Sequence, residues 1–247
     1  MKNLICAIRA GLIALCLCAA SAQASVVVGG TRVVFPAQDN EVTVRLTNQA
    51  NRPALIEAWI DDGDMQSTPD KVNVPFLVTP PLFRMEANKD QSLRIIGTPS
   101  QLPRDRESLF WLNVLEVPPK PTGPEMQGKN TLQFAIRSRL KLFYRPANLS
   151  GDPGKAPEQV TWKAVADGQG YALEVHNPTP YYITFSKVSL SVAGTEFTAE
   201  PGMVDPMGHL RLSLKGLTHA PSAGSAIAFD VINDYGAGTP FKGAITP

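Results

Sequence analysis

Apolar and polar residues alternate in short runs along nearly the whole chain, and proline, glycine, asparagine and aspartate separate the runs. Alternation with a period of two places successive side chains on opposite faces of an extended strand, whereas no long stretch repeats apolar residues at helical spacing. The pattern therefore predicts an all-β protein. In the first half of the chain it predicts strands over residues 26–35, 41–47, 54–60, 76–79, 91–96, 108–117 and 132–144.

The second half shows the same pattern, which predicts strands over residues 160–164, 171–176, 181–185, 187–192, 209–214 and 226–232. Residues 145–154 lie between the halves and contain prolines, which lack a backbone donor, together with glycine, asparagine and aspartate, which favour turns. Strand pairing should therefore stop there. We predict two immunoglobulin-like β-sandwich domains, formed by residues 25–147 and 148–247.

The first residues have the features of a secretory signal peptide. Lys2 and Arg9 precede the uncharged apolar run 10–20, and small residues two positions apart then form a cleavage pattern that ends at Ala24. We expect residues 1–24 to be removed on export. The cysteines of the chain all lie in this segment: Cys6, Cys16 and Cys18. Disulfides and thiol chemistry are therefore not expected in the exported protein.

The charges of the chain are nearly balanced. It has 23 basic and 22 acidic residues, and removal of Lys2 and Arg9 leaves 21 basic residues against the same 22 acids. This balance gives no global field that would attract nucleic acid or an anionic membrane. Basic residues are dense only near the end of the first domain: Arg137, Arg139, Lys141 and Arg145.

The predicted strand 132–144 is longer than the commonest strand length of about five or six residues. One of its faces carries Leu132, Phe134, Ile136, Ser138, Leu140 and Leu142, and the other carries Gln133, Arg137, Arg139 and Lys141. An apolar row ordinarily fills a core, and periodicity alone favours that interpretation. A long apolar strand with an open edge also invites pairing with another chain, so both interpretations remain open at this point.

Six motifs resemble those of the PapD-like periplasmic pilus chaperones, and they occur in the same order along nearly the whole chain after residue 24. The motifs are Thr31-Arg32-Val33-Val34-Phe35, Pro80-Pro81-Leu82-Phe83-Arg84, Asp105-Arg106-Glu107-Ser108-Leu109-Phe110-Trp111, Leu140-Lys141-Leu142-Phe143-Tyr144-Arg145-Pro146, Asn177-Pro178-Thr179-Pro180-Tyr181-Tyr182 and Ile232-Asn233-Asp234-Tyr235-Gly236. The resemblance implies two sandwich domains in a boomerang arrangement. It also implies a periplasmic, ATP-independent chaperone that holds pilus subunits and delivers them to an outer-membrane usher.

The resemblance also assigns residues to the binding of a subunit. It implies that Arg32 and Lys141 anchor the subunit's C-terminal carboxylate through charge-assisted hydrogen bonds. It implies that Leu132, Phe134 and Ile136 fill the groove that the subunit's missing strand leaves open, a process called donor-strand complementation. Such a groove and its unpaired edge would otherwise drive aggregation of the subunit.

Other features of the family carry over as expectations. Glu107, Arg145 and Asp234 match an interdomain charge network, which we expect to fix the angle between the domains. The loop before the strand 132–144 is short, as in the branch of the family that assembles rod-like pili. The sequence leaves the isomers of the peptides before Pro80 and Pro81 open, and the resemblance also allows a self-capping dimer.

Functions of other classes fit the sequence less well. A hydrolase would need a nucleophile beside a base, but the chain after residue 24 has no cysteine and no Gly-x-Ser-x-Gly elbow. Met203, Met207 and His209 are soft ligands that suit copper, yet methionines near turns more often fill gaps in a core. We therefore expect no catalytic site, metal or cofactor. The more serious alternative is a secreted immunoglobulin-like adhesion module, although an adhesin has no reason to pair Arg32 with Lys141 beside an apolar strand.

Overall fold

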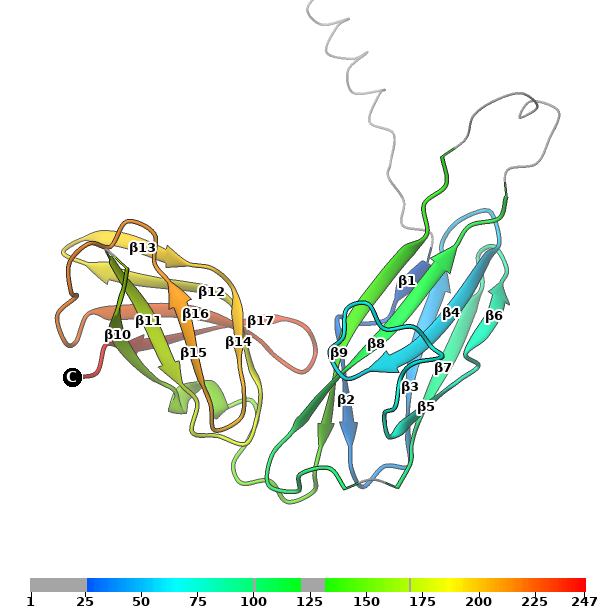
Figure 1. Cartoon of the computed structure of the whole chain (residues 1–247), viewed down its shortest axis with the longest axis horizontal. Coiled ribbons are helices and arrows are strands. Elements are labelled where there is room, and N and C mark those ends of the chain that lie inside the picture. Colours follow the sequence, from blue (N-terminus) through cyan, green and yellow to red (C-terminus); the bar gives the residue numbers. More distant parts are fainter. Residues whose placement is uncertain (1–25, 100, 121–131, 169) are drawn as a thin grey trace, which may run out of the picture.

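The computed structural model of the protein describes residues 26–99, 101–120, 132–168 and 170–247. The chain forms two β lobes that lie at an angle to each other and are joined at one end (Figure 1). The predicted all-β class is confirmed, because strands account for nearly all the regular structure described. The predicted signal peptide, residues 1–24, lies outside the described residues, as does most of the short loop that precedes the strand 132–144. Within the described residues no helix has the length and apolarity needed to span a membrane.

The N-terminal lobe is a sandwich of two sheets. One sheet has the order β1 (Val26–Val28), β3 (Glu41–Asn48), β7 (Asp90–Gly97) and β5 (Phe76–Thr79). The other has the order β2 (Arg32–Pro36), β9 (Ile136–Arg145), β8 (Ser108–Val117), β4 (Ala54–Asp61) and β6 (Leu82–Met85). Alternate side chains of both sheets meet in one core, which includes Phe35, Leu46, Ile56, Leu93, Leu112 and Leu142.

The C-terminal lobe is a second sandwich with its own core. Its smaller sheet has the order β10 (Thr161–Asp167), β11 (Gly170–His176) and β15 (His209–Ser213). Its larger sheet has the order β13 (Thr195–Ala199), β12 (Ile183–Val192), β16 (Ala226–Ile232) and β17 (Gly238–Ala244), and β14 (Gly202–Val204) also pairs with β12. The short 3-10 helix η2 (Ala156–Gln159) lies in the connection between the lobes. Trp162, Phe185 and Phe229 pack together at the centre of this core.

The first predicted strand, 26–35, is in fact two strands in different sheets. β1 pairs with β3 in one sheet, and β2 pairs in parallel with β9 in the other. Gly30 lies between them with φ of 142°, a conformation that residues with a Cβ rarely adopt. The chain can therefore cross from one sheet to the other here, and the crossing places Arg32 opposite Lys141.

The predicted strand 132–144 is shorter at its start than expected. β9 begins at Ile136, which lies opposite Glu116 near the end of β8. Beyond that point β8 leads into Pro118 and Pro119, whose nitrogens cannot donate to a ladder. Residues 132–135 therefore have no strand partner within the described part of the chain.

Several other strands differ from the prediction. Strands β6, β13, β14 and β17 were not predicted, and the runs 181–185 and 187–192 join into β12, with a register shift between Phe185 and Lys187. β17 contains Pro240 and two glycines, which are poor strand formers, but the edge of a sheet tolerates them. The Thr79–Pro80 peptide, whose isomer the sequence left open, is cis.

Candidate functional site

The apolar row on the last strand of the N-terminal lobe divides into two parts. Leu140 and Leu142 are buried in the sandwich core. Ile136, Phe134 and Leu132 are exposed by 52%, 68% and 79%. Core burial, the interpretation that periodicity favours, therefore holds only for Leu140 and Leu142. The other three apolar side chains of the row are exposed to solvent.

One edge of β9 is open beside these exposed side chains. β8 pairs with residues 136–144 of β9, whereas β2 covers only residues 141–145 of the other edge. Within the described residues, the edge from 136 to 140 carries backbone groups without a strand partner. An open edge next to apolar side chains is the geometry that accepts a strand from another chain. An added strand would have to end or turn away where β2 begins, at Arg32.

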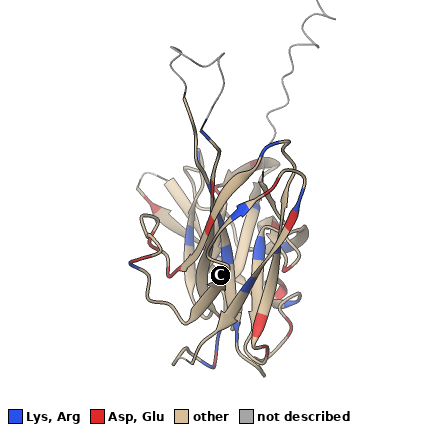
Figure 2. Cartoon of the chain, turned by 90° about the vertical axis from the view of Figure 1, so that its right-hand side faces the viewer, with Lys and Arg blue, Asp and Glu red and all other residues tan. Residues whose placement is uncertain are grey.

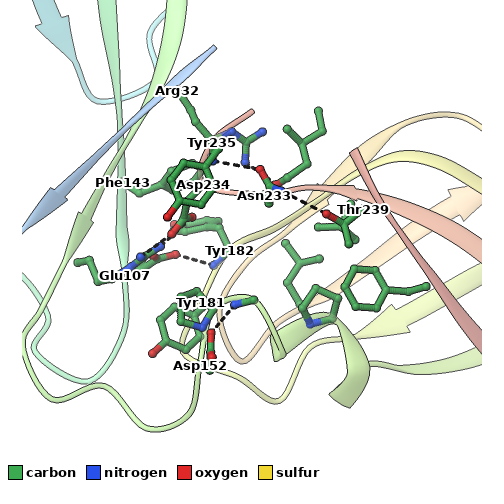
Figure 3. A pocket seen from close by; sticks show the side chains of 18 residues that line it. Arg32, Glu107, Phe143, Asp152, Tyr181, Tyr182, Asn233, Asp234, Tyr235 and Thr239 are labelled. Atoms are coloured by element: carbon green, nitrogen blue, oxygen red, sulfur yellow. Dashed lines mark hydrogen bonds and ion pairs between the residues drawn. The ribbon is translucent and has the colours of Figure 1, made fainter. Parts of the chain in front are cut away.

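Arg32 and Lys141 lie side by side at that point, as register partners of β2 and β9. The Arg32 Nη1 donates a hydrogen bond of 2.8 Å to the Ile232 carbonyl of the C-terminal lobe, and its guanidinium lies 5.7 Å from the centre of the Phe143 ring (Figure 3). The Arg32 Nε is buried and has no hydrogen-bond partner. Lys141 Nζ lies 3.3 Å from Thr184 Oγ1, also in the C-terminal lobe. Both cations thus lie between the lobes, and the Arg32 Nε is a buried donor without a partner among the described residues.

The electrostatics of this pair favour an anion. Burial, together with the nearby charge of Arg32, lowers the pKa of Lys141 to about 8. Burial also lowers the pKa of Arg32, although Asp234 and Glu107 partly offset that effect. Neither cation forms an ion pair with a carboxylate among the described residues. An incoming carboxylate would relieve the repulsion between them and satisfy the unpaired Nε.

The structure brings Glu107, Arg145 and Asp234 together where the lobes meet. Glu107 and Asp234 are labelled in Figure 3. The Arg145 Nε donates to Glu107 at 2.7 Å, and its two terminal nitrogens donate to Asp234 at 2.7 and 3.0 Å. Glu107 also accepts a bond of 2.8 Å from the backbone nitrogen of Tyr182. Burial disfavours the charged guanidinium, but the bonds and charges of Asp234 and Glu107 outweigh it and raise the pKa of Arg145. One guanidinium thus joins the N-terminal lobe to a turn of the C-terminal lobe.

A cavity of about 410 Å³ opens between the lobes beside this network. Its lining combines Arg32 and Phe143 from the N-terminal lobe with Tyr182 and Asp234 from the C-terminal lobe. The turn that carries Asp234 also contains Tyr235, whose side chain is 94% exposed. The cleft therefore has both apolar and charged walls, and Arg32 is the member of the cation pair that lines it.

Sequence reasoning missed a second charged cluster on the same sheet. The sequence analysis placed Arg137 and Arg139 on the face of the strand opposite the apolar row and predicted no partner for them. In the structure both contact Asp61, a carboxylate with no exposed surface at the end of β4. The available signal was an acid at the end of a buried strand and two arginines on one face of another strand. This signal is not sufficient, because nothing in the sequence shows that β4 and β9 lie on either side of β8.

The soft ligands that the sequence offered lie near one another along the chain: Met203 in β14, Met207 in the turn after it and His209 at the start of β15. His176 and His209 face each other across β11 and β15 with ring centres 4.4 Å apart, in a stacked arrangement. Met207 is 46% exposed, so it does not fill the core as expected. No group of three or more histidine, cysteine, aspartate or glutamate residues in the described ranges is arranged to hold a metal ion.

Comparison with known proteins gives the same family for both lobes. Residues 25–150 match the model of the pili and flagellar-assembly chaperone PapD N-terminal domain, and residues 155–242 match that of the pili assembly chaperone PapD C-terminal domain. The chaperone protein FimB/FhaD of Bordetella pertussis is 47% identical over 231 residues, which is 92% of this chain and 91% of that protein. The chaperone protein FimC of Escherichia coli is 41% identical over 224 residues, covering 90% and 85%.

Solved structures show the same similarity. The crystal structure of the YadV chaperone has a TM-score of 0.76 and 37% identity, covering 90% of this chain and all of that one. A chain from the structure of the Salmonella enterica SafA pilin in complex with the SafB chaperone has a TM-score of 0.73 and 32% identity, covering 92% and 99%.

Proposed function

Because this chain belongs to the PapD family of pili assembly chaperones, we propose that it binds pilus subunits in the periplasm by donor-strand complementation and delivers them to an outer-membrane usher. The observation that carries this proposal is the open edge of β9, which lies beside exposed apolar side chains and ends at two cations. We propose export to the periplasm with removal of residues 1–24, and no catalytic step. The function needs no cofactor, since subunit folding can drive release.

The exposed apolar residues of the row fill the groove of the subunit and so account for the chaperone activity. Leu132, Phe134 and Ile136 alternate with outward residues, so all three can enter one groove of a partner whose own strand is missing. Main-chain hydrogen bonds from the open edge of β9 would pair the partner's unpaired strand. Phe134 is the bulkiest of the three, so the groove of an accepted subunit needs its widest pocket there.

The pair Arg32 and Lys141 determines where the C terminus of the subunit binds. A subunit strand on the open edge occupies the same side of β9 as β2 and meets the first residue of β2. If its C-terminal carboxylate lies between Arg32 and Lys141, the strand runs in parallel with β9, as β2 does. The guanidinium of Arg32 and the ammonium of Lys141 then both donate to the carboxylate. The Glu107, Arg145 and Asp234 network supports this geometry by holding the two domains, residues 25–147 and 148–247, at one angle.

Binding of the carboxylate should weaken at alkaline pH. The pKa of Lys141 lies at about 8 in the free protein, and only its protonated form attracts a carboxylate. Affinity for a subunit should therefore be greatest below pH 8 and fall above it, by up to about tenfold per pH unit. Isothermal titration of the chaperone with a subunit across this range would measure the change. Lys141→Arg should remove the pH dependence, because a guanidinium stays charged.

The stability of the free protein should change in the opposite direction. The pKa of Lys141 in the folded protein lies below its ordinary value of 10.5, so between the two values the unfolded chain binds the proton more tightly. The contribution of Lys141 to the free energy of unfolding therefore rises with pH over that interval. A parallel loss of affinity and stability above pH 8 would contradict the assignment, since it would indicate general unfolding.

Capture of subunits tests the function as a whole. The tagged protein should be purified from the periplasm of cells that express the fimbrial subunits of its own gene cluster, and the bound proteins identified by mass spectrometry. We expect subunits in about equimolar amounts with the chaperone. Recovery of the protein without subunits would instead favour the secreted adhesion module, which binds its target through loops.

A further inference from the structure

The outward face of β9 carries several cations, but most of them already have carboxylate partners. Arg137 and Arg139 contact Asp61, and Arg145 contacts Glu107 and Asp234. Lys141 is the one cation of this row without an ion-pair partner in the described part of the chain. Figure 2 shows the same mixture of basic and acidic residues over the strands of the N-terminal lobe.

Asp61 is built into the sheet as the partner of the two arginines. It has no exposed surface and accepts hydrogen bonds from Asn113 at 2.6 Å, from the Gly63 backbone at 2.8 Å and from Ser67 at 3.1 Å. Arg139 donates to both of its carboxylate oxygens. Burial favours the protonated acid, but these bonds, above all that from Arg139, outweigh it and lower the pKa of Asp61.

The two arginines differ in how much they depend on Asp61. Arg137 also donates to Asn113 Oδ1 and to the Met65 carbonyl, both at 2.8 Å, and it lies over the Trp59 ring. The hydrogen bonds of the Arg139 guanidinium all go to Asp61, and its other neighbour is the face of Trp111. Loss of the Asp61 charge would therefore release Arg139 first.

A released Arg139 would create an ambiguity in strand pairing. Arg139 lies two residues before Lys141 on the same face of β9, a separation of about 6.6 Å along the strand. Side chains alternate with a period of two, so a partner strand that slips by two residues keeps every apolar side chain on its original face. The alternation of apolar residues cannot by itself reject such a slip. Apart from the fit of Phe134 in its pocket, only the position of the free cation distinguishes the two registers.

We propose that Asp61 determines the register in which a subunit strand pairs with β9. Its ion pair with Arg139 keeps that arginine from binding the subunit's carboxylate, so that Lys141 and Arg32 form the single carboxylate site. This inference rests on the proposed carboxylate anchor and extends it to a residue that does not touch the subunit. Asp61 acts through Arg139, as a positioning residue. A chaperone without its charge would still bind subunits, but in two registers.

Disulfide cross-linking can measure the register, because the chain has no cysteine after residue 24. The background is the full exported chain with Ser138→Cys, and the probe is a synthetic peptide of alternating valine and threonine with a free C-terminal carboxylate. One peptide carries a cysteine opposite residue 138 when its carboxylate lies at Lys141. A second peptide carries the cysteine two residues nearer its C terminus, opposite residue 138 when the carboxylate lies at Arg139. Amidated versions of both serve as controls.

The protein with Asp61 intact should cross-link the first peptide at least about tenfold faster than the second, the effect of one charge-assisted hydrogen bond. Asp61→Asn should bring the two cross-linking rates within about threefold of each other, because the peptide carboxylate can then bind at either Arg139 or Lys141. Asp61→Asn combined with Arg139→Gln should restore the original preference. A merely structural role of Asp61 predicts no such rescue, since the second substitution removes a further contact.

Far-UV circular dichroism would show whether Asp61→Asn folds. If it does not, a matched double variant tests the proposal instead. If two released guanidinium groups unfold Asp61→Asn, Asp61→Asn with Arg137→Gln leaves only Arg139 free and should show the same altered preference. An unchanged preference in a folded Asp61→Asn or in this double variant overturns the register proposal while leaving the anchor intact. Equal cross-linking of acid and amide peptides overturns the anchor itself, so the two failures are distinguishable.

Discussion

Replacing Arg32 and Lys141 together by alanine should reduce the affinity for pilus subunits by at least about 100-fold, because two hydrogen bonds to a charged carboxylate are lost. The two cations lie side by side between the lobes, and neither has an ion-pair partner among the described residues. The remainder of the interface, along the open edge of β9, stays intact. Surface plasmon resonance with the subunits recovered by co-purification would measure the change.

The same double variant should remain folded. Burial lowers the pKa of both Arg32 and Lys141, so each charged group is less favourable in the folded protein than in water. Their removal should leave the urea midpoint unchanged or higher. Arg52→Ala with Lys71→Ala removes two cations elsewhere on the same lobe and should leave affinity unchanged. Normal capture by the Arg32 and Lys141 variant would remove the carboxylate anchor and place the binding energy in the strand alone.

Replacing Leu132, Phe134 and Ile136 by serine should reduce subunit affinity by at least about 1,000-fold, since burial of each such side chain contributes about 1.5–3 kcal/mol. All three are more than half exposed in the free protein. The triple variant should therefore unfold at the same urea concentration as the original protein. Affinity measurements with the same subunits would test the loss, and light scattering of refolding subunits would show whether they now aggregate.

A matched control for the triple variant is available on the same lobe. Leu77 and Leu82 are 59% and 57% exposed. Leu77 lies in β5 of the other sheet, and Leu82 lies in β6, which β4 and β8 separate from β9. Leu77→Ser with Leu82→Ser should leave affinity unchanged, which would separate groove filling from a general effect of surface apolarity. If the triple serine variant still prevented aggregation, main-chain pairing along β9 would have to be sufficient for chaperone activity.

The sequence predicted the features that depend on local pattern. Alternation alone indicated strands at β3, β4, β8 and β16, because a period of two in apolar residues is a local feature of an extended strand. The motifs carried the family assignment. Elements that lack a strong pattern were missed, notably β17 with its proline and glycines, which pairing with β16 stabilises at the sheet edge.

The sequence by itself thus determined that this is a two-lobed β protein with an apolar row and a basic row on one long strand. Only the tertiary structure decided which part of each row is available. β2 covers the edge at 141–145 and leaves 136–140 open, and Asp61, 78 residues from Arg139 in the chain, neutralises one cation while Lys141 stays unpaired. Periodicity specifies the face on which a side chain lies, but its burial and charge partners depend on elements that folding brings from distant positions in the chain.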